Sequence, residues 1–223
     1  MSERQTSVDV PGAGAVSVIE SVPDHLGGWQ FIYAPGAGSN VHNPFGKFAC
    51  RELTARGVAS TRFQFPYQEA RKHGPDRPPV LEATWRAVIQ ELRSPGMRLV
   101  IGGRSMGGRI ASQIVAAGES VDALALFAYP LHPPGRPDQR RDSHLYAITV
   151  PTLFCSGTKD AFASPEELTG VAAIAPNATY HLLEGADHGF SVNKASGHTR
   201  EDVWGEAVEA MLEWLKVGIA FTG

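Results

Sequence analysis

Polar and apolar residues alternate along the first part of the chain. Residues 7–10 and 15–19 both show this alternation, and a Pro-Gly-Ala-Gly stretch at 11–14 separates them. This pattern predicts an antiparallel hairpin with one face toward solvent. Residues 29–34 are instead almost continuously apolar, which is typical of a strand that is buried on both faces.

Strand-like and helix-like segments take turns along the rest of the chain. Strands are expected at 61–65, 98–101, 123–128, 149–155 and 179–183. Helices are expected at 44–57, 80–93, 106–117, 165–174 and 200–216, and loops at 67–79 and 130–146. This order predicts an α/β fold with a mostly parallel, doubly wound sheet after the antiparallel hairpin. Because neither a repeat nor a linker divides the sequence, we expect one domain over residues 1–223.

Composition narrows the class of protein. The chain has 223 residues, 43% of them hydrophobic and 19% charged, which excludes disordered, collagen-like and coiled-coil proteins. A net charge of −3 argues against a nucleic-acid partner. The apolar runs are too short to span a membrane, and the first residues lack the order of a signal peptide. Cys50 and Cys155 are too few for a disulfide framework. We therefore expect a cytoplasmic protein without a nucleic-acid or membrane partner.

A candidate nucleophile lies in the Gly-Arg-Ser-Met-Gly sequence at 103–107. The motif follows a predicted strand and precedes a predicted helix, which is the context of a G-x-S-x-G nucleophile elbow. Such a turn would expose the hydroxyl of Ser105 and direct the backbone N–H of Met106 into the same space. The alternative is a glycine-rich connection without a catalytic role.

A serine hydroxyl needs a base, and in elbow enzymes an acid and then a histidine follow the serine along the chain. Asp160 and His188 have this order, and each follows the carboxyl end of a predicted strand. Catalytic groups of open α/β sheets gather at that edge. We therefore predict His188 as the base and Asp160 as the acid, with Asp187 and Glu184 as alternative acids.

The other histidines compete with His188 for this role. We expect His181 to be structural, because it lies within a strand, and three histidines in polar segments to be solvated: His25, His73 and His198. A further three either line a pocket or lie on the surface: His42, His132 and His144.

A second Pro-Gly-Ala-Gly stretch, at 35–38, follows the fully apolar strand. Elbow enzymes place the second N–H of the oxyanion hole at this point, and Ala37 N–H is the candidate donor. A dinucleotide-binding loop would need a third glycine where the chain has Val41, and no P-loop lysine follows. We therefore expect neither a nucleotide nor another organic cofactor, and no residue spacing indicates a metal site.

These motifs resemble those of the α/β-hydrolase superfamily. Four phrases at 101–109, 62–67, 129–135 and 185–188 are similar to a dienelactone-hydrolase-like branch that includes the small testis-expressed and KANSL-type hydrolase-like proteins. The resemblance implies an α/β-hydrolase fold and a serine hydrolase without a metal or organic cofactor. Dienelactone hydrolases proper carry cysteine at the elbow, so the serine here argues against their lactone substrate.

The expected activity is hydrolysis of a small ester, thioester or related acyl substrate. The alternatives are a catalytically silent interaction module, or an acyltransferase or peptidase with the same triad. Only a short loop separates Tyr129 from Pro151, so we expect an open site without a lid domain. Six basic loop residues either rim the pocket, which would indicate an acidic substrate, or are solvated: Arg71, Lys72, Arg77, Arg136, Arg140 and Arg141.

Overall fold

The computed structural model of the chain describes residues 1–171, 175 and 177–217. Within them, an eight-stranded sheet has the order β1-β2-β4-β3-β5-β6-β7-β8. The strands are β1 (Ser2–Val10), β2 (Gly14–Val22), β3 (Trp29–Ala34), β4 (Ala59–Phe63), β5 (Arg98–Arg104), β6 (Ala123–Phe127), β7 (Thr152–Gly157) and β8 (Ala178–Leu183). β1, β2 and β4 pair antiparallel, and the pairs from β4 through β3 to β8 are parallel. The predicted α/β-hydrolase fold with an antiparallel N-terminal hairpin is thereby confirmed.

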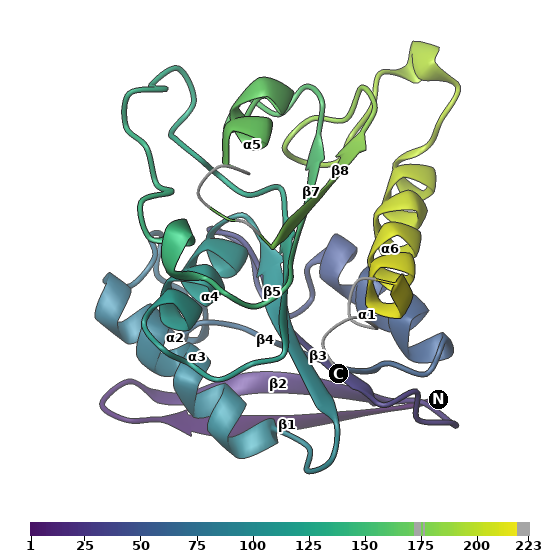
Figure 1. The fold of residues 1–223 in the computed structure, drawn as a ribbon. Helices are drawn as coiled ribbons and strands as arrows, with labels where there is room; N and C mark the ends of the chain where they lie inside the picture. Colours follow the sequence, from purple (N-terminus) through teal and green to yellow (C-terminus); the bar gives the residue numbers. More distant parts are fainter. Residues whose placement is uncertain (172–174, 176, 218–223) are drawn as a thin grey trace.

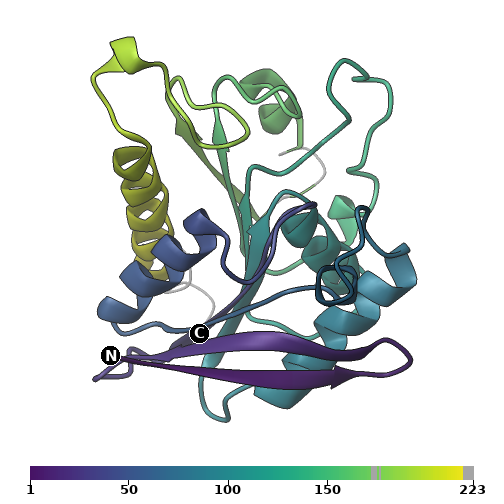
Figure 2. The ribbon, with the colours of Figure 1, turned by 180° about the vertical axis from the view of Figure 1, so that it is seen from behind.

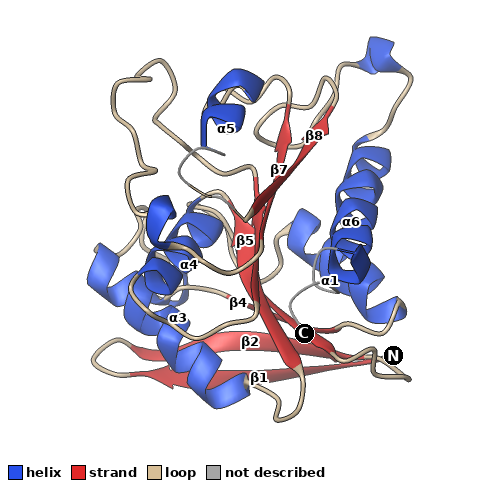
Figure 3. Ribbon diagram, in the orientation of Figure 1, coloured by secondary structure: helices blue, strands red, loops and turns tan. Residues whose placement is uncertain are grey.

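Helices cover both faces of the sheet (Figures 1 and 3). The helices are α1 (Pro44–Ala55), α2 (Pro66–Glu69), α3 (Pro78–Leu92), α4 (Met106–Ala116), α5 (Pro165–Val171) and α6 (Arg200–Val217), with 3-10 turns η1 (Leu145–Ala147) and η2 (Lys194–Ser196). α3 and α4 lie on one face, and α1 and α6 lie on the other. Among the described residues, no helix combines the length and apolar character that crossing a membrane requires.

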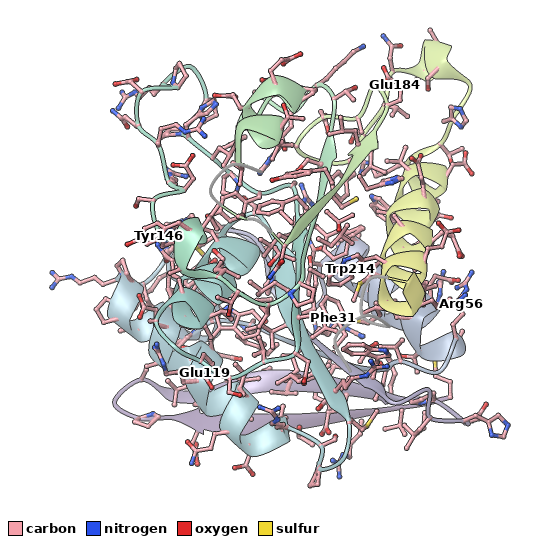
Figure 4. The ribbon with its side chains drawn as sticks, in the orientation of Figure 1. Phe31, Arg56, Glu119, Tyr146, Glu184 and Trp214 are labelled. Carbon is pink, nitrogen blue, oxygen red and sulfur yellow. The ribbon has the colours of Figure 1, made fainter. Side chains whose placement is uncertain are left out.

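Each layer of helices encloses its own hydrophobic core. On the α3 side, Trp85 is fully buried and packs edge-on against Phe63, with 4.8 Å between the ring centroids. On the α1 side, Phe45 packs edge-on against Phe127 at 5.1 Å. Phe31 of β3 and Trp214 of α6 belong to this second core (Figure 4). Because edge-to-face aromatic pairs are favourable, they fix how each helix sits on the sheet.

The hairpin extends further than the alternating pattern predicts. β1 begins at Ser2 and β2 ends at Val22, beyond the alternating segments. The outer part is joined by polar pairs across the strands, such as Arg4 with Glu20 at 2.9 Å. Polar pairing of this kind leaves no alternation of apolar residues to detect. Seen from behind, the hairpin runs along the end of the sheet, beneath α3 (Figure 2).

Other helices and strands begin or end a few residues away from the predicted positions. The predicted strand at 149–155 begins at Thr152, directly after Pro151, which has no N–H to give to a ladder. The predicted loop at 67–79 starts with the one-turn helix α2, which Pro66 opens at its first position. Residues 172–174 of the helix expected at 165–174 lie outside the described residues.

Candidate active site

Ser105 occupies a sharp turn between β5 and α4. Its φ of 52° and ψ of −118° are unusual for a residue with a side chain, and such a conformation costs of order 1–3 kcal/mol. Its N–H donates to the carbonyl of Phe127 at 2.9 Å, and its own carbonyl accepts from Arg109 N–H at 3.0 Å. These bonds hold the strained turn and leave the hydroxyl free to face a cavity.

Two glycines make room for this turn. A Cβ on Gly103 would lie 2.0 Å from the carbonyl oxygen of Ala34, and a Cβ on Gly107 would lie 2.3 Å from the same atom. Both distances are far below van der Waals contact. Bare backbone is therefore required where β5 and α4 pass the end of β3, as a G-x-S-x-G elbow demands.

His188 joins Ser105 to Asp160 through a chain of hydrogen-bond contacts. The Nε2 atom of His188 lies 3.0 Å from Ser105 Oγ. Its Nδ1 atom lies 2.8 Å from Asp160 Oδ2 and 3.0 Å from Oδ1. The structure thus brings together three residues that come from the ends of β5, β7 and β8, at hydrogen-bond distances throughout.

Buried contacts hold the acid and the imidazole in place. The side chain of Asp160 has no exposure, whereas that of His188 is 22% exposed. Asp160 Oδ1 also accepts the N–H of Phe162 at 2.8 Å. Arg104 donates from Nη2 to the backbone carbonyl of His188 at 2.8 Å. Arg104 therefore ties the loop of the histidine to the strand that carries the serine.

The two alternative acids do not contact the imidazole. The Asp187 carboxylate accepts the backbone N–H groups of Gly189 and Ser191, at 2.7 and 2.9 Å, and so shapes the loop. Glu184 lies at the start of the loop that follows β8 (Figure 4) and lines a different hollow. Asp160 is thus the acid that the geometry favours.

The two predicted oxyanion donors border the same cavity as Ser105. Met106 is the first residue of α4, so its N–H has no partner within the helix. Ala37 follows Gly36, where an added Cβ would lie 3.3 Å from the Cβ of Ser105. This close approach brings the loop after β3 beside the serine.

The cavity has a volume of about 550 Å³, which is within the range of small-molecule sites. Pro75, Leu81 and Pro130 contribute apolar walls, and Phe162 lies beside the imidazole. Of the histidines, all of which are among the described residues, His188 alone lines it.

None of the three histidines that were expected either in a pocket or on the surface lines the cavity, and His42 is exposed on the surface. Two are held by polar neighbours: His132 Nε2 lies 3.0 Å from Glu167, and His144 Nε2 lies 2.8 Å from Ser112 Oγ. His181, expected to be structural, lies 2.9 Å from Glu206 Oε1.

The basic residues at the cavity differ from those that the sequence indicated. Among the six basic loop residues, only Arg141 lines it; the other five are exposed. Two arginines that sequence reasoning missed, Arg104 and Arg109, line it as well. Arg109 follows Ser105 by four residues on a helix, and this spacing could have placed both on one face. For Phe162, no comparable signal exists in the sequence.

In the part of the chain that the structure describes, no three side chains of His, Cys, Asp or Glu gather as the ligands of a metal ion would.

Comparison with known proteins places this geometry in context. Residues 28–216 match the family described as an alpha/beta hydrolase domain. XC6422 from Xanthomonas campestris, described as an α/β serine hydrolase without a lid, superposes with a TM-score of 0.72 at 19% identity, over 96% of this chain and 95% of that one. Est1E from Butyrivibrio proteoclasticus gives 0.73 at 15% identity, over 95% and 99%.

A thioesterase domain from the curacin biosynthetic pathway is also similar. Its TM-score is 0.71 at 16% identity, and the match covers 95% of this chain and all of that domain, 100%. At such low identities, these three structures show a shared fold.

Proposed function

Because the chain belongs to the alpha/beta hydrolase domain family, we propose that it is a serine hydrolase acting on a small ester, thioester or related acyl substrate. In this proposal Ser105 is the nucleophile, His188 the general base and Asp160 the acid. One observation carries it: the unbroken chain of contacts from Ser105 Oγ through the imidazole to the Asp160 carboxylate, at 3.0 and 2.8 Å.

The first half of the reaction forms an acyl-enzyme. His188 Nε2 takes the proton of Ser105 Oγ while that oxygen attacks the substrate carbonyl. The proton then passes from the imidazolium to the leaving alcohol or thiol as its bond to the carbonyl carbon breaks. Asp160 keeps Nδ1 protonated and stabilises the imidazolium. Since its carboxylate is fully buried, it is poorly screened by water and acts strongly on the ring.

The second half returns the free enzyme. Water gives its proton to His188 and attacks the acyl carbon, and Ser105 leaves with the proton that the imidazole gives back. In both halves, the N–H groups of Ala37 and Met106 would bind the oxyanion. Losing one such donor costs about 3–4 kcal/mol of transition-state stabilisation in other serine hydrolases.

The cavity and the structural neighbours support this class of substrate. The cavity is of small-molecule size, and XC6422, which shares the fold, is described as lacking a lid; both favour a small acyl group over a large buried lipid. Est1E has been seen with ferulic acid bound, and DcsB with a substrate analogue. We extend the proposal to the dienelactone-hydrolase-like branch with the testis-expressed and KANSL-type proteins, on the motifs around Ser105 and His188. A cytoplasmic location stays a prediction.

The proposal is tested by labelling with a fluorophosphonate, which reacts with an activated serine. We expect the native chain to be labelled and the Ser105→Ala variant to remain unlabelled and inactive on p-nitrophenyl acetate. Ser143→Ala, which removes an exposed serine hydroxyl outside the cavity, is the matched control and keeps both signals. Equal labelling of native chain and Ser105→Ala would exclude Ser105 as the nucleophile.

The same experiment separates the alternatives. An unlabelled but folded native chain would indicate a silent interaction module on a hydrolase scaffold. A labelled chain that hydrolyses esters poorly but transfers the acyl group to an added amine or thiol would be an acyltransferase. Cleavage of peptide substrates would indicate a peptidase.

A further inference from the structure

Two arginines face the cavity without an acidic partner. Arg109 of α4 and Arg141 of the loop before η1 both line the space beside Ser105, and both are half-buried. Among the described residues, neither forms an ion pair. Half-buried guanidinium groups are costly unless they are paired, because burial removes part of their hydration.

Arg140, which precedes Arg141, shows that an arginine of this loop can form ion pairs. Arg140 pairs with Asp142, and its Nη1 lies 3.2 Å from Glu167 Oε1. The backbone of Arg141 is also fixed on both sides: its N–H donates to the carbonyl of Leu131 at 2.8 Å, and its carbonyl accepts from Tyr129 Oη at 3.0 Å. The loop therefore holds Arg141 at the cavity in advance of any ligand, which lowers the entropic cost of binding.

Arg109 is in an unfavourable electrostatic environment. Its Nε is buried and has no hydrogen-bond partner among the described residues. Burial lowers the pKa of Arg109, and the positive charge of Arg141 lowers it further. Burial, together with the charge of Arg109, also lowers the pKa of His144 to about 4, so His144 is neutral near pH 7. An anion between the two arginines would relieve this repulsion.

The nearby carboxylates are already occupied. Asp76 also lines the cavity, but its Oδ2 accepts the N–H of Tyr67 at 2.7 Å, and its Oδ1 lies 3.8 Å from the Lys72 ammonium. Asp142 is bound by Arg140. Arg104 adds a third positive charge to the cavity wall. The charge of the site is thus positive in a protein whose net charge is −3.

We propose that Arg109 and Arg141 bind an anionic group of the substrate, so that the site prefers acyl substrates with a carboxylate or phosphate near the reacting carbonyl. This inference rests on the proposed function. Guanidinium groups suit such anions because they offer paired N–H donors. Four residues of α-helix rise about 6 Å, so Arg109 lies about one turn from Ser105. In the preferred substrate, a chain of a few carbon atoms therefore joins the reacting carbonyl to the anionic group.

The test compares anionic substrates with neutral controls. Monoethyl glutarate and monoethyl adipate carry a carboxylate on the acyl side, and their controls carry a carboxamide in its place. 3-Acetoxypropyl phosphate carries a phosphate on the alcohol side, and 3-acetoxypropanol is its control. We expect kcat/KM for the anionic member to exceed that of its control at least tenfold in one of the two series. The series that shows the preference identifies the side of the ester, and the kind of anion, that the arginines bind.

Variants connect the preference to the two side chains. Arg109→Met and Arg141→Met keep much of the side-chain volume and remove the charge, and each should reduce the anionic-to-neutral ratio at least threefold. The double variant should bring it near one. Arg136→Met, which removes a positive charge from an exposed residue of the same loop, leaves the ratio unchanged. If one single variant does not fold, the other still tests the proposal.

Two outcomes would overturn the inference: a ratio near one in the native protein for both series, or a preference that survives in the folded variants. Neither outcome affects the proposed hydrolase activity, because hydrolysis of the neutral esters and fluorophosphonate labelling at Ser105 are measured separately. Loss of labelling would instead remove the proposed function itself.

Discussion

Phe162 stacks on the imidazole of His188, with 4.0 Å between the ring centroids and 26° between the planes. Phe162 comes two residues after Asp160, and its N–H donates to the carboxylate of that residue. One short loop after β7 therefore supplies both the acid that contacts Nδ1 and the surface on which the ring lies. Asp160 holds the imidazole at its edge, through Nδ1, and Phe162 holds it at its face.

Removing this stacking should weaken catalysis without abolishing it. In Phe162→Leu the backbone N–H to Asp160 stays, but the aromatic contact is lost. Such contacts are worth about 0.5–1.5 kcal/mol, so we expect kcat to fall by roughly 2- to 12-fold. Phe162→Tyr keeps the ring and should retain most of the activity. A leucine variant with native kcat would show that the stacking does not position the base.

The acids can be ranked by two isosteric changes. Asp160→Asn should favour the wrong imidazole tautomer and reduce kcat by about 10⁴-fold, as in other triads. Asp187→Asn should cost far less, because an amide oxygen can still accept the N–H groups of Gly189 and Ser191. Acylation rates in a single turnover with an activated ester measure both. A larger loss in Asp187→Asn would mean that the acid is misassigned.

The requirement for bare backbone at the elbow is testable with two helical glycines. Gly107→Ala in α4 would place a Cβ 2.3 Å from the carbonyl oxygen of Ala34 and should lower both stability and activity. In α6, a Cβ on Gly205 meets nothing within 4 Å. Gly205→Ala should therefore raise stability by about 0.5–1 kcal/mol. Urea unfolding measures the free energy of unfolding of the two variants. Equal values would contradict the requirement for bare backbone at the elbow.

Acid should destabilise the folded protein through His144. Its pKa in the folded state is lowered to about 4, first by burial and then by the charge of Arg109. The unfolded chain therefore binds more protons than the folded one between about pH 6.5 and pH 4, and stability falls as pH falls through this range.

The variant His144→Leu removes this titrating group. Its Tm should fall less than that of the native protein between pH 7 and pH 4.5, as measured by thermal unfolding at several pH values. Parallel Tm curves for the two proteins would show that His144 is not held neutral in the folded state.

The fold and the grouping of Ser105, Asp160 and His188 were accessible from sequence because local patterns encode them. The elbow at 103–107 needs glycine at fixed positions, and the apolar runs before Ser105 and Asp160 place both residues at the ends of strands. Since the carboxyl ends of parallel strands meet at one edge, order along the chain was enough to bring His188 to them.

The contacts around the triad depend on tertiary packing, and the sequence carries little trace of them. Which arginines face the cavity is decided by the path of the loop before η1, where Arg140 pairs with acids and Arg141 does not. The stacking of Phe162 depends on how the loops after β7 and β8 meet. Neither relationship leaves a periodic pattern.

The position of β8 at the edge of the sheet has a consequence for how activity would be lost. Among the described strands, β8 is the last in the sheet order and pairs with β7 alone, and the loop that follows it carries His188. Edge elements can open locally at a lower free-energy cost than global unfolding. Opening of β8 would separate the imidazole from Ser105 while β3, β5 and their helices stay folded. Loss of the proposed activity in heat or urea would then precede the loss of most secondary structure, and activity would measure whether one strand is still in place.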